Sequence, residues 1–281
     1  NLSAESEPEI FEGLALAGHW VDPERGLLST IVMETSGSSR LCALLKPGEK
    51  VVLMGPSGTP ADIPTGQTVL LAGGGFGNAV LLSIAAALRS AHNRVLYFAG
   101  YRRMEDAYKR SEIERASDTV VWCTDTMPAL QARRGQDRAF NGNIAAAITA
   151  YGAGKLGLPP IPLNQVTRLL TVGSEGMMRS VADARRGSLA HAFAEDSQAY
   201  GCINSPMQCM MKEICAQCLH RQVDPATGKE SFVFSCLNQS QLLDVVDFDH
   251  LAARLKQNSA SEKLGGLWLD HILGQRLGEP R

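Results

Sequence analysis

The sequence predicts an α/β fold built on a mainly parallel sheet. Strand and helix patterns alternate between residues 65 and 195, which is typical of βαβ units. Before this stretch, short strands and turns follow one another closely, as they do in a β-barrel or sandwich. After it, five of the seven cysteines fall between residues 202 and 236. We therefore expect three parts, over residues 1–64, 65–195 and 196–281.

The first part contains too few strands to close a barrel. Residues 26–35 are the first expected strand, and a turn then leads into a short helical pattern from Leu41 to Leu45. A second strand is expected at 51–54, just before the turn at residues 55–58. Because two or three strands cannot form a closed barrel, we expect only the final part of one here.

Hydrophobic periodicity places alternating strands and helices in the middle part. The expected strands are the apolar runs at 68–72, 94–99, 119–124 and 167–172. The expected helices cover 78–90, 105–116, 143–151 and 176–186. Such alternation predicts a parallel sheet with helices on both faces.

Two amphipathic helices, at 249–257 and 261–277, are expected to end the third part. The apolar stripe on the second consists of Leu264, Leu267, Trp268, Ile272, Leu273 and Leu277. Two interpretations fit this stripe. It either covers the core of its own domain or docks onto a larger subunit.

Composition excludes several classes of protein. Hydrophobic residues make up 44% of the 281 residues and charged residues 20%, as in globular rather than disordered proteins. The net charge of −2 provides no basic surface for nucleic acid. No apolar run approaches the ~18 residues that a membrane span needs, and the acidic N-terminus lacks the apolar core of a signal peptide. We therefore expect a cytoplasmic protein with no membrane span and no nucleic-acid partner.

A glycine-rich loop joins the strand at 68–72 to the helix that follows. It comprises Gly73, Gly74, Gly75, Phe76, Gly77 and Asn78. Glycines let the backbone approach a phosphate closely, and the N-terminus of the next helix favours an anion. Asn78 stands where the dinucleotide fingerprint has its last glycine. The loop either binds a phosphate or is a tight turn that binds nothing, and the entropy cost of four glycines favours the first interpretation.

Four cysteines follow the pattern C-x5-C-x2-C-x17-C: Cys209, Cys215, Cys218 and Cys236. The first interval is one residue longer than in the plant-type [2Fe–2S] spacing. Four thiolates also suit tetrahedral zinc, although zinc ribbons usually carry two C-x2-C pairs. The spacing favours an iron–sulfur cluster over a zinc site and over unliganded thiols.

Charged residues follow two of the expected strands. Thr124 and Asp125 end the strand at 119–124, at the carboxyl edge where open α/β sheets bind ligands. Arg102 and Arg103 follow the strand at 94–99. These arginines either pair with the 2′-phosphate of a nucleotide or are solvated, so the choice between NAD and NADP stays open.

The order of these features resembles the ferredoxin reductase-like iron–sulfur flavoproteins. This family includes the electron-transfer subunit of dihydroorotate dehydrogenase and the small subunit of NADH-dependent ferredoxin:NADP transhydrogenases. The resemblance covers residues 26–236. It implies that the first part binds FAD, that the glycine loop binds NAD(P)H, and that the four cysteines hold a [2Fe–2S] cluster.

The resemblance also assigns two further segments. The turn that it places against the FAD pyrophosphate is Ser36, Gly37, Ser38 and Ser39. The segment that it places beside the nicotinamide includes Gly173, Ser174, Glu175 and Met177, and here Val172 and Ser174 replace the family's cysteine and proline. The earlier barrel strands of the family have no counterpart before Gly26. We expect them to come from a longer polypeptide or from a partner.

The expected function is that of an NAD(P)H-dependent electron-transfer oxidoreductase, present as a subunit or fragment. In the family, a hydride passes from NAD(P)H to the flavin, and single electrons pass through the cluster to a larger partner enzyme. Because the cofactors carry this chemistry, no catalytic side chain is expected. The alternative is a non-enzymatic, zinc-stabilised nucleotide-binding or interaction module.

Overall fold

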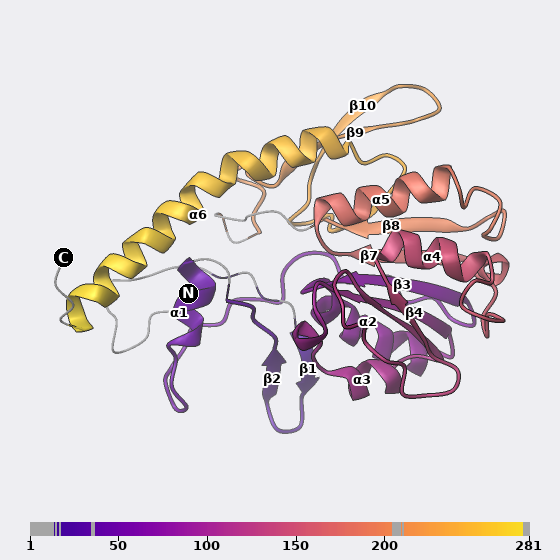
Figure 1. The fold of residues 1–281 in the computed structure, drawn as a ribbon. Helices are drawn as coiled ribbons and strands as arrows, with labels where there is room; N and C mark the ends of the chain where they lie inside the picture. The colour runs from indigo at the N-terminus through magenta and orange to yellow at the C-terminus, as the bar shows by residue number, and fades with distance from the viewer. Residues whose placement is uncertain are drawn as a thin grey trace.

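The computed structural model describes residues 14, 16, 18–34, 37–203, 209 and 211–277. Its centre is a seven-stranded sheet in the order β11-β8-β7-β3-β4-β5-β6 (Figure 1). Neighbouring strands run parallel, except that β11 pairs antiparallel with β8. The strands are β3 (Thr68–Gly74), β4 (Arg94–Tyr101), β5 (Thr119–Thr124), β6 (Arg138–Asn141), β7 (Arg168–Val172), β8 (Gln198–Cys202) and β11 (Ser240–Leu242). The predicted parallel sheet is confirmed.

Helices cover both faces of the sheet and give three layers (Figure 1). Side chains of β4 alternate between the two cores: Leu96 and Phe98 face one, and Tyr97 and Ala99 face the other. This two-sided burial explains why the central strands are near-continuous apolar runs. The helices are α2 (Gly77–Ser90) and α3 (Arg110–Arg115) on one face, and α4 (Ile144–Gly152) and α5 (Glu175–Arg186) on the other.

Short elements complete the middle part. The helix expected at 105–116 is divided into a 3-10 turn, η1 (Met104–Asp106), and the shorter α3. Lys109 separates the two in a left-handed conformation, with φ of +52°. The structure also contains β6 and the 3-10 turn η2 (Leu163–Gln165), which the sequence patterns do not predict.

The N-terminal part is a hairpin followed by a short helix. The hairpin consists of β1 (Gly18–Asp22) and β2 (Leu27–Thr30), and the helix is α1 (Gly37–Ala43). The first strand was missed, and the second is shorter than the predicted 26–35. The strand predicted at 51–54 was wrong: Val51, Val52, Leu53 and Met54 are exposed and form no strand. A β-favouring sequence forms a strand only where a neighbouring strand supplies ladder hydrogen bonds and packing.

A partly buried polar contact joins the hairpin to the α/β layers. His19 of β1 is only 6% exposed, and its Nε2 lies 2.8 Å from Oε2 of Glu112 on α3. Glu112 also pairs with Lys109 at 2.8 Å. This contact fixes the hairpin beside α3.

The C-terminal part extends the sheet and ends in one long helix. Strands β8 and β11 belong to the central sheet, so the sheet crosses the boundary expected at residue 195. A second hairpin is formed by β9 (Leu219–Val223) and β10 (Glu230–Phe234). The two predicted C-terminal helices are a single helix, α6 (Phe248–Leu277), because residues 257–261 contain neither proline nor glycine to break it.

The apolar stripe of α6 is divided between two environments. Ile272 of the stripe packs, together with the neighbouring Leu269, against Leu41 of α1, whereas Leu264 and Trp268 of the stripe are 67% and 58% exposed. Figure 1 shows α1 against the C-terminal half of α6. No helix among the described residues is long and apolar enough to cross a membrane.

Candidate nucleotide cleft and cysteine loop

The glycine loop turns sharply between β3 and α2. Gly75 has φ of +54°, a left-handed value that costs an L-residue free energy. Its N–H donates to the Gly100 carbonyl of β4 at 2.8 Å. A side chain at Gly75 would meet no atom within 4 Å. The backbone here therefore faces open space, which a ligand can enter closely.

Two other glycines of the loop are explained by packing alone. A Cβ at Gly73 would overlap the side chain of Asn78, and one at Gly77 would overlap the carbonyl of Val172 on β7. From the sequence, a bound phosphate is the favoured reason for the four glycines, and a simple tight turn is the alternative. In the structure, Gly73 and Gly77 are needed because other parts of the chain approach them closely, so the prediction of a bound phosphate depends on Gly75.

The side chain of Asn78 supports the glycine loop through hydrogen bonds. It is fully buried, and its Nδ2 donates to the carbonyls of Gly75 and Gly100 at 3.1 and 3.2 Å. The Tyr97 hydroxyl donates to its Oδ1 at 3.2 Å. Asn78 was expected among the cofactor-binding residues, but these partners make it a residue that positions the loop.

An open cleft of about 420 Å³ lies at the carboxyl edge of the sheet, above this loop. The N-termini of α4 and α5 border it, each with a capping side chain: Asn143 accepts from the Ala146 N–H, and Ser174 from the Met177 N–H. Helix N-termini favour anions. The lining residues are Gly74, Gly75, Gly100, Tyr101, Arg102, Asp125, Gly142, Asn143, Ile144, Ala145, Ser174, Gly176, Met177 and Ser180.

The segment after β7 forms one wall of the cleft. A Cβ at Gly173 would overlap Cε of Met177, and one at Gly74 would lie 3.1 Å from the same atom. The Met177 side chain therefore packs over the carboxyl end of β3, and this packing requires glycine at positions 74 and 173. The side chain of Glu175 is turned to Arg179, at 3.1 Å, instead of lining the cleft.

The end of β5 supplies one lining residue and one supporting residue. Asp125 lines the cleft, as expected. Thr124 is fully buried; its hydroxyl accepts from the Leu130 N–H at 3.3 Å, and its carbonyl accepts from the Gly142 N–H at 2.8 Å. Thr124 thus positions the loops around Asp125.

The two arginines after β4 differ. Arg102 lines the cleft, whereas Arg103 is paired with Asp106 at 3.1 Å. Gly142 and Asn143 also line the cleft but are not among the site residues that the sequence predicts. The signal was present, since an Asn at the start of an apolar helical run is a typical N-cap.

The turn expected to hold FAD lies elsewhere. Ser36 is outside the described residues, and Gly37, Ser38 and Ser39 belong to α1, which packs against α6 and does not line the cleft. The described residues of the N-terminal part form a two-stranded hairpin. FAD contacts at this turn therefore stay a prediction.

In the cysteine loop, which contains Cys209, Cys215 and Cys218, backbone N–H groups lie close to a cysteine sulfur atom. The N–H groups of Lys212 and Ile214 lie 3.4 and 3.5 Å from Sγ of Cys209. The pKa of Cys209 falls to about 6, chiefly through the backbone N–H of Cys215 and also through those of Ile214 and Lys212. Met211 and Glu213 have positive φ values of +63° and +56°, which bend the loop around Cys209. Hydrogen bonds of this kind stabilise a thiolate.

Cys209 lies beside Cys215, Cys218 lies beside Cys236, and Cys215 is also near enough to Cys218 for the two thiols to interact. Burial raises the pKa of Cys218 to about 11, although a hydrogen bond from the Cys236 backbone acts in the opposite direction. Within the described part of the chain, no three His, Cys, Asp or Glu side chains converge closely enough to hold a metal ion. The thiol donors and the N–H groups around Cys209 fit a thiolate-bound metal cluster. Assembly of all four around one cluster stays a prediction.

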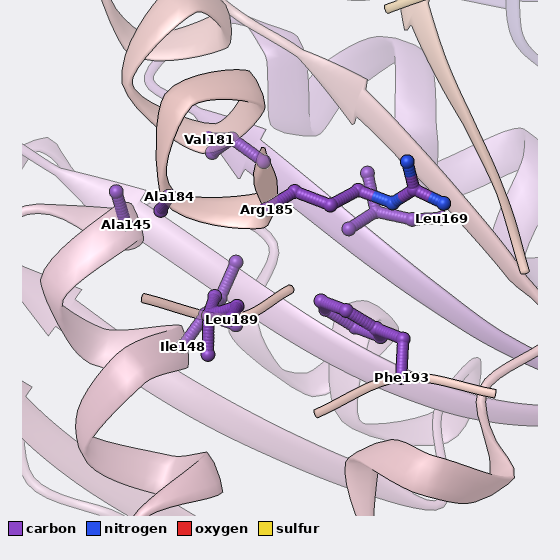
Figure 2. Close-up of a pocket in the computed structure, with 8 residues that line it drawn as sticks. All are labelled: Ala145, Ile148, Leu169, Val181, Ala184, Arg185, Leu189 and Phe193. Atoms are coloured by element: carbon purple, nitrogen blue, oxygen red, sulfur yellow. The ribbon is translucent and has the colours of Figure 1, made fainter. Parts of the chain in front are cut away.

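A small apolar hollow beneath α4 and α5 is a different kind of feature. Figure 2 shows Ile148, Leu189 and Phe193 around it. The hollow has no room for a water molecule, and the Arg185 guanidinium bonds to Asp244 at 2.9 Å. It is a gap in core packing, and we assign it no ligand.

Comparison with known proteins finds relatives but no matching family model. An uncharacterized protein of Rickettsia prowazekii, RP006, is 28% identical over 256 residues, which cover 91% of this chain and 27% of that protein. The dihydroorotate dehydrogenase B (NAD(+)) electron transfer subunit homolog of Thermotoga maritima is 33% identical over 104 residues, 37% of each chain. The corresponding subunit of Enterococcus faecalis is 31% identical over 117 residues, 40% of this chain and 44% of that protein.

A solved structure shares the fold. It is an NADH-dependent reduced ferredoxin-NADP oxidoreductase, with a TM-score of 0.69 and 22% identity over 89% of this chain and 79% of that chain. This chain is related to the ferredoxin reductase-like iron–sulfur flavoproteins. The resemblance inferred from the glycine loop and the cysteines is thereby confirmed. The chain spans between 27% and 44% of the length of the three curated relatives described above.

Proposed function

We propose that this chain is an electron-transfer component of an oxidoreductase. It would take electrons from NAD(P)H through FAD to a [2Fe–2S] cluster, and pass them to a larger partner subunit or domain. The observation that carries the proposal is the cysteine loop, in which backbone N–H groups surround the Cys209 sulfur. The names of the curated relatives support the same role.

The cleft suits a dinucleotide in shape and charge. We assign the pyrophosphate to Gly75, where the backbone faces open space, and to the N-termini of α4 and α5, where helix dipoles favour negative charge. The Asp125 carboxylate can accept hydrogen bonds from ribose hydroxyls. Arg102 lies in the same lining and can pair with a phosphate. Met177 covers the β3 end, where we place the nicotinamide.

The remaining residues position the cofactors. Gly37, Ser38 and Ser39, with Ser36, would meet FAD once further strands complete the barrel. Cys209, Cys215, Cys218 and Cys236 would hold the cluster. When bound, FAD accepts a hydride and the [2Fe–2S] cluster carries single electrons. The chain's own contribution is to hold these groups close together and to exclude water from between them.

Metal analysis of the anaerobically purified protein tests the proposal. We expect two irons and two sulfides for each chain and visible absorption, as for any [2Fe–2S] protein. Cys215→Ser and Cys218→Ser should each abolish the iron content and the absorption of the cluster, whereas Cys42→Ser, on α1, should leave both unchanged. Zinc in place of iron in the native protein would contradict the electron-transfer proposal and favour a zinc-stabilised module.

A further inference from the structure

Arg254 of α6 reaches into the cysteine loop. Its Nη2 donates to the Ala216 carbonyl at 2.6 Å and to the Gln217 carbonyl at 3.3 Å. Both carbonyls lie between Cys215 and Cys218. Ala216 adopts a left-handed conformation, with φ of +56°, and so turns its carbonyl in a direction that most residues avoid. The guanidinium therefore fixes the loop from the side of the long helix.

Among the described residues, no carboxylate neutralises the charge of Arg254. Its other hydrogen bond goes to the neutral amide oxygen of Gln257, at 2.9 Å. Across the described residues, no ion pair to Arg254 falls within 4 Å, and its Nε is buried without a hydrogen-bond partner. Arg221 provides the contrast, because Asp247 and Glu230 pair with it at 2.6 and 2.9 Å.

We infer that Arg254 is a positioning residue that raises the reduction potential of the cluster held by this loop. The inference depends on the proposed function. One-electron reduction adds one negative charge to the cluster, and a fixed positive charge nearby stabilises that form. Because α6 is a single continuous helix, it also holds this charge in a constant position.

Two substitutions separate the charge from the hydrogen bonds. Arg254→Gln keeps a donor for the loop carbonyls but removes the charge, and Arg254→Lys keeps both the charge and a donor. Arg221→Gln is the matched control, since its charge is already paired. The readouts are iron content for each chain and the midpoint potential from a redox titration followed by electron paramagnetic resonance.

With the native iron content in all variants, we expect the Arg254→Gln potential to shift to a more negative value. The Arg254→Lys and Arg221→Gln potentials should stay close to that of the native protein. An unshifted Arg254→Gln potential, or an equal shift in Arg254→Lys, would overturn the inference. If Arg254→Gln fails to retain iron, the Arg254→Lys variant decides the question. A midpoint potential of Arg254→Lys clearly more negative than that of the native protein would overturn the inference, and an unchanged potential would support it. If the proposed function itself is wrong, the native protein will contain no iron, and this outcome is distinct from all of those above.

Discussion

Gly58 lies directly against the backbone carbonyl of Cys236. A Cβ added at Gly58 would be 3.3 Å from that oxygen, and the residue has φ of +84°. Beside it, the Ser57 hydroxyl lies 2.9 Å from Sδ of Met211, within the loop that bends around Cys209. Ser57 and Gly58, at the end of the N-terminal part, thus contact the cysteine region at two points, Met211 and Cys236. This contact would bring a flavin domain and an iron–sulfur cluster close together.

Gly58→Ala should disturb this contact. The left-handed φ alone costs about 1 kcal/mol for an alanine, and the crowded Cys236 carbonyl adds to it. Gly48→Ala is the matched control, because Gly48 has φ of +93° and open space around it. We expect Gly58→Ala to lower both the unfolding temperature and the retained iron more than the control does. Equal effects of the two substitutions would show that the contact with Cys236 contributes nothing.

Gly75→Val should weaken nucleotide binding. The branched side chain would project into the cleft where we place the pyrophosphate, and it would be strained at φ of +54°. We expect the dissociation constant for NAD(P)H, measured by calorimetry, to rise at least ~10-fold, or about 1.4 kcal/mol. Gly66→Val is the control, since Gly66 has φ of +69°, open surroundings and no place in the cleft. Unchanged affinity in Gly75→Val would leave the loop as a simple turn.

Asn78→Ala should destabilise the whole α/β part. It leaves the buried carbonyls of Gly75 and Gly100 without their side-chain donor and removes the acceptor of the Tyr97 hydroxyl. Each lost buried partner costs about 1 kcal/mol or more, so we expect a loss of about 3 kcal/mol in the free energy of unfolding. Tyr97→Phe removes one of these bonds and should cost about 1 kcal/mol. Urea denaturation of both variants and of the double variant tests whether the bonds act as one network.

Acid should loosen the N-terminal hairpin. Burial raises the pKa of Glu112, but hydrogen bonds from Lys109 and His19 outweigh it and hold the pKa below its ordinary value of 4.5. A carboxyl with a lowered folded pKa stabilises the fold fully above its ordinary value and loses this effect as the pH falls through the folded value. The protection factors of the β1 amides, obtained from hydrogen exchange relative to the intrinsic rate at each pH, should therefore fall below about pH 4.5.

Glu112→Gln should reproduce this loosening at neutral pH. The matched control is Glu114→Gln on the same helix, because Glu114 pairs with Arg133 at 3.0 Å and not with the hairpin. If β1 exchange is unaffected in Glu112→Gln, the contact between His19 and Glu112 does not hold the hairpin in place.

The sequence by itself determined the parallel sheet and the resemblance to a family. The strands around Leu70, Phe98 and Val121 are buried on both sides. They are therefore continuous apolar runs, which are easy to recognise as strands in the sequence. The glycine loop and the cysteine spacing are local patterns, readable without any knowledge of distant contacts. They were sufficient to predict the relatives that the comparisons found.

Only the tertiary structure decided which residues of these motifs face a ligand. Gly73 and Gly77 are glycines because Asn78 and Val172 approach them, and Thr124 supports the cleft from within the core. Residues 51–54 have the composition of a strand, yet they belong to none of the sheets in the described part of the chain. Contacts such as Gly58 with Cys236 and Arg254 with Ala216 join segments far apart in the chain. Local propensity contains no information about such contacts, because their energy exists only once the partner segments have been packed together.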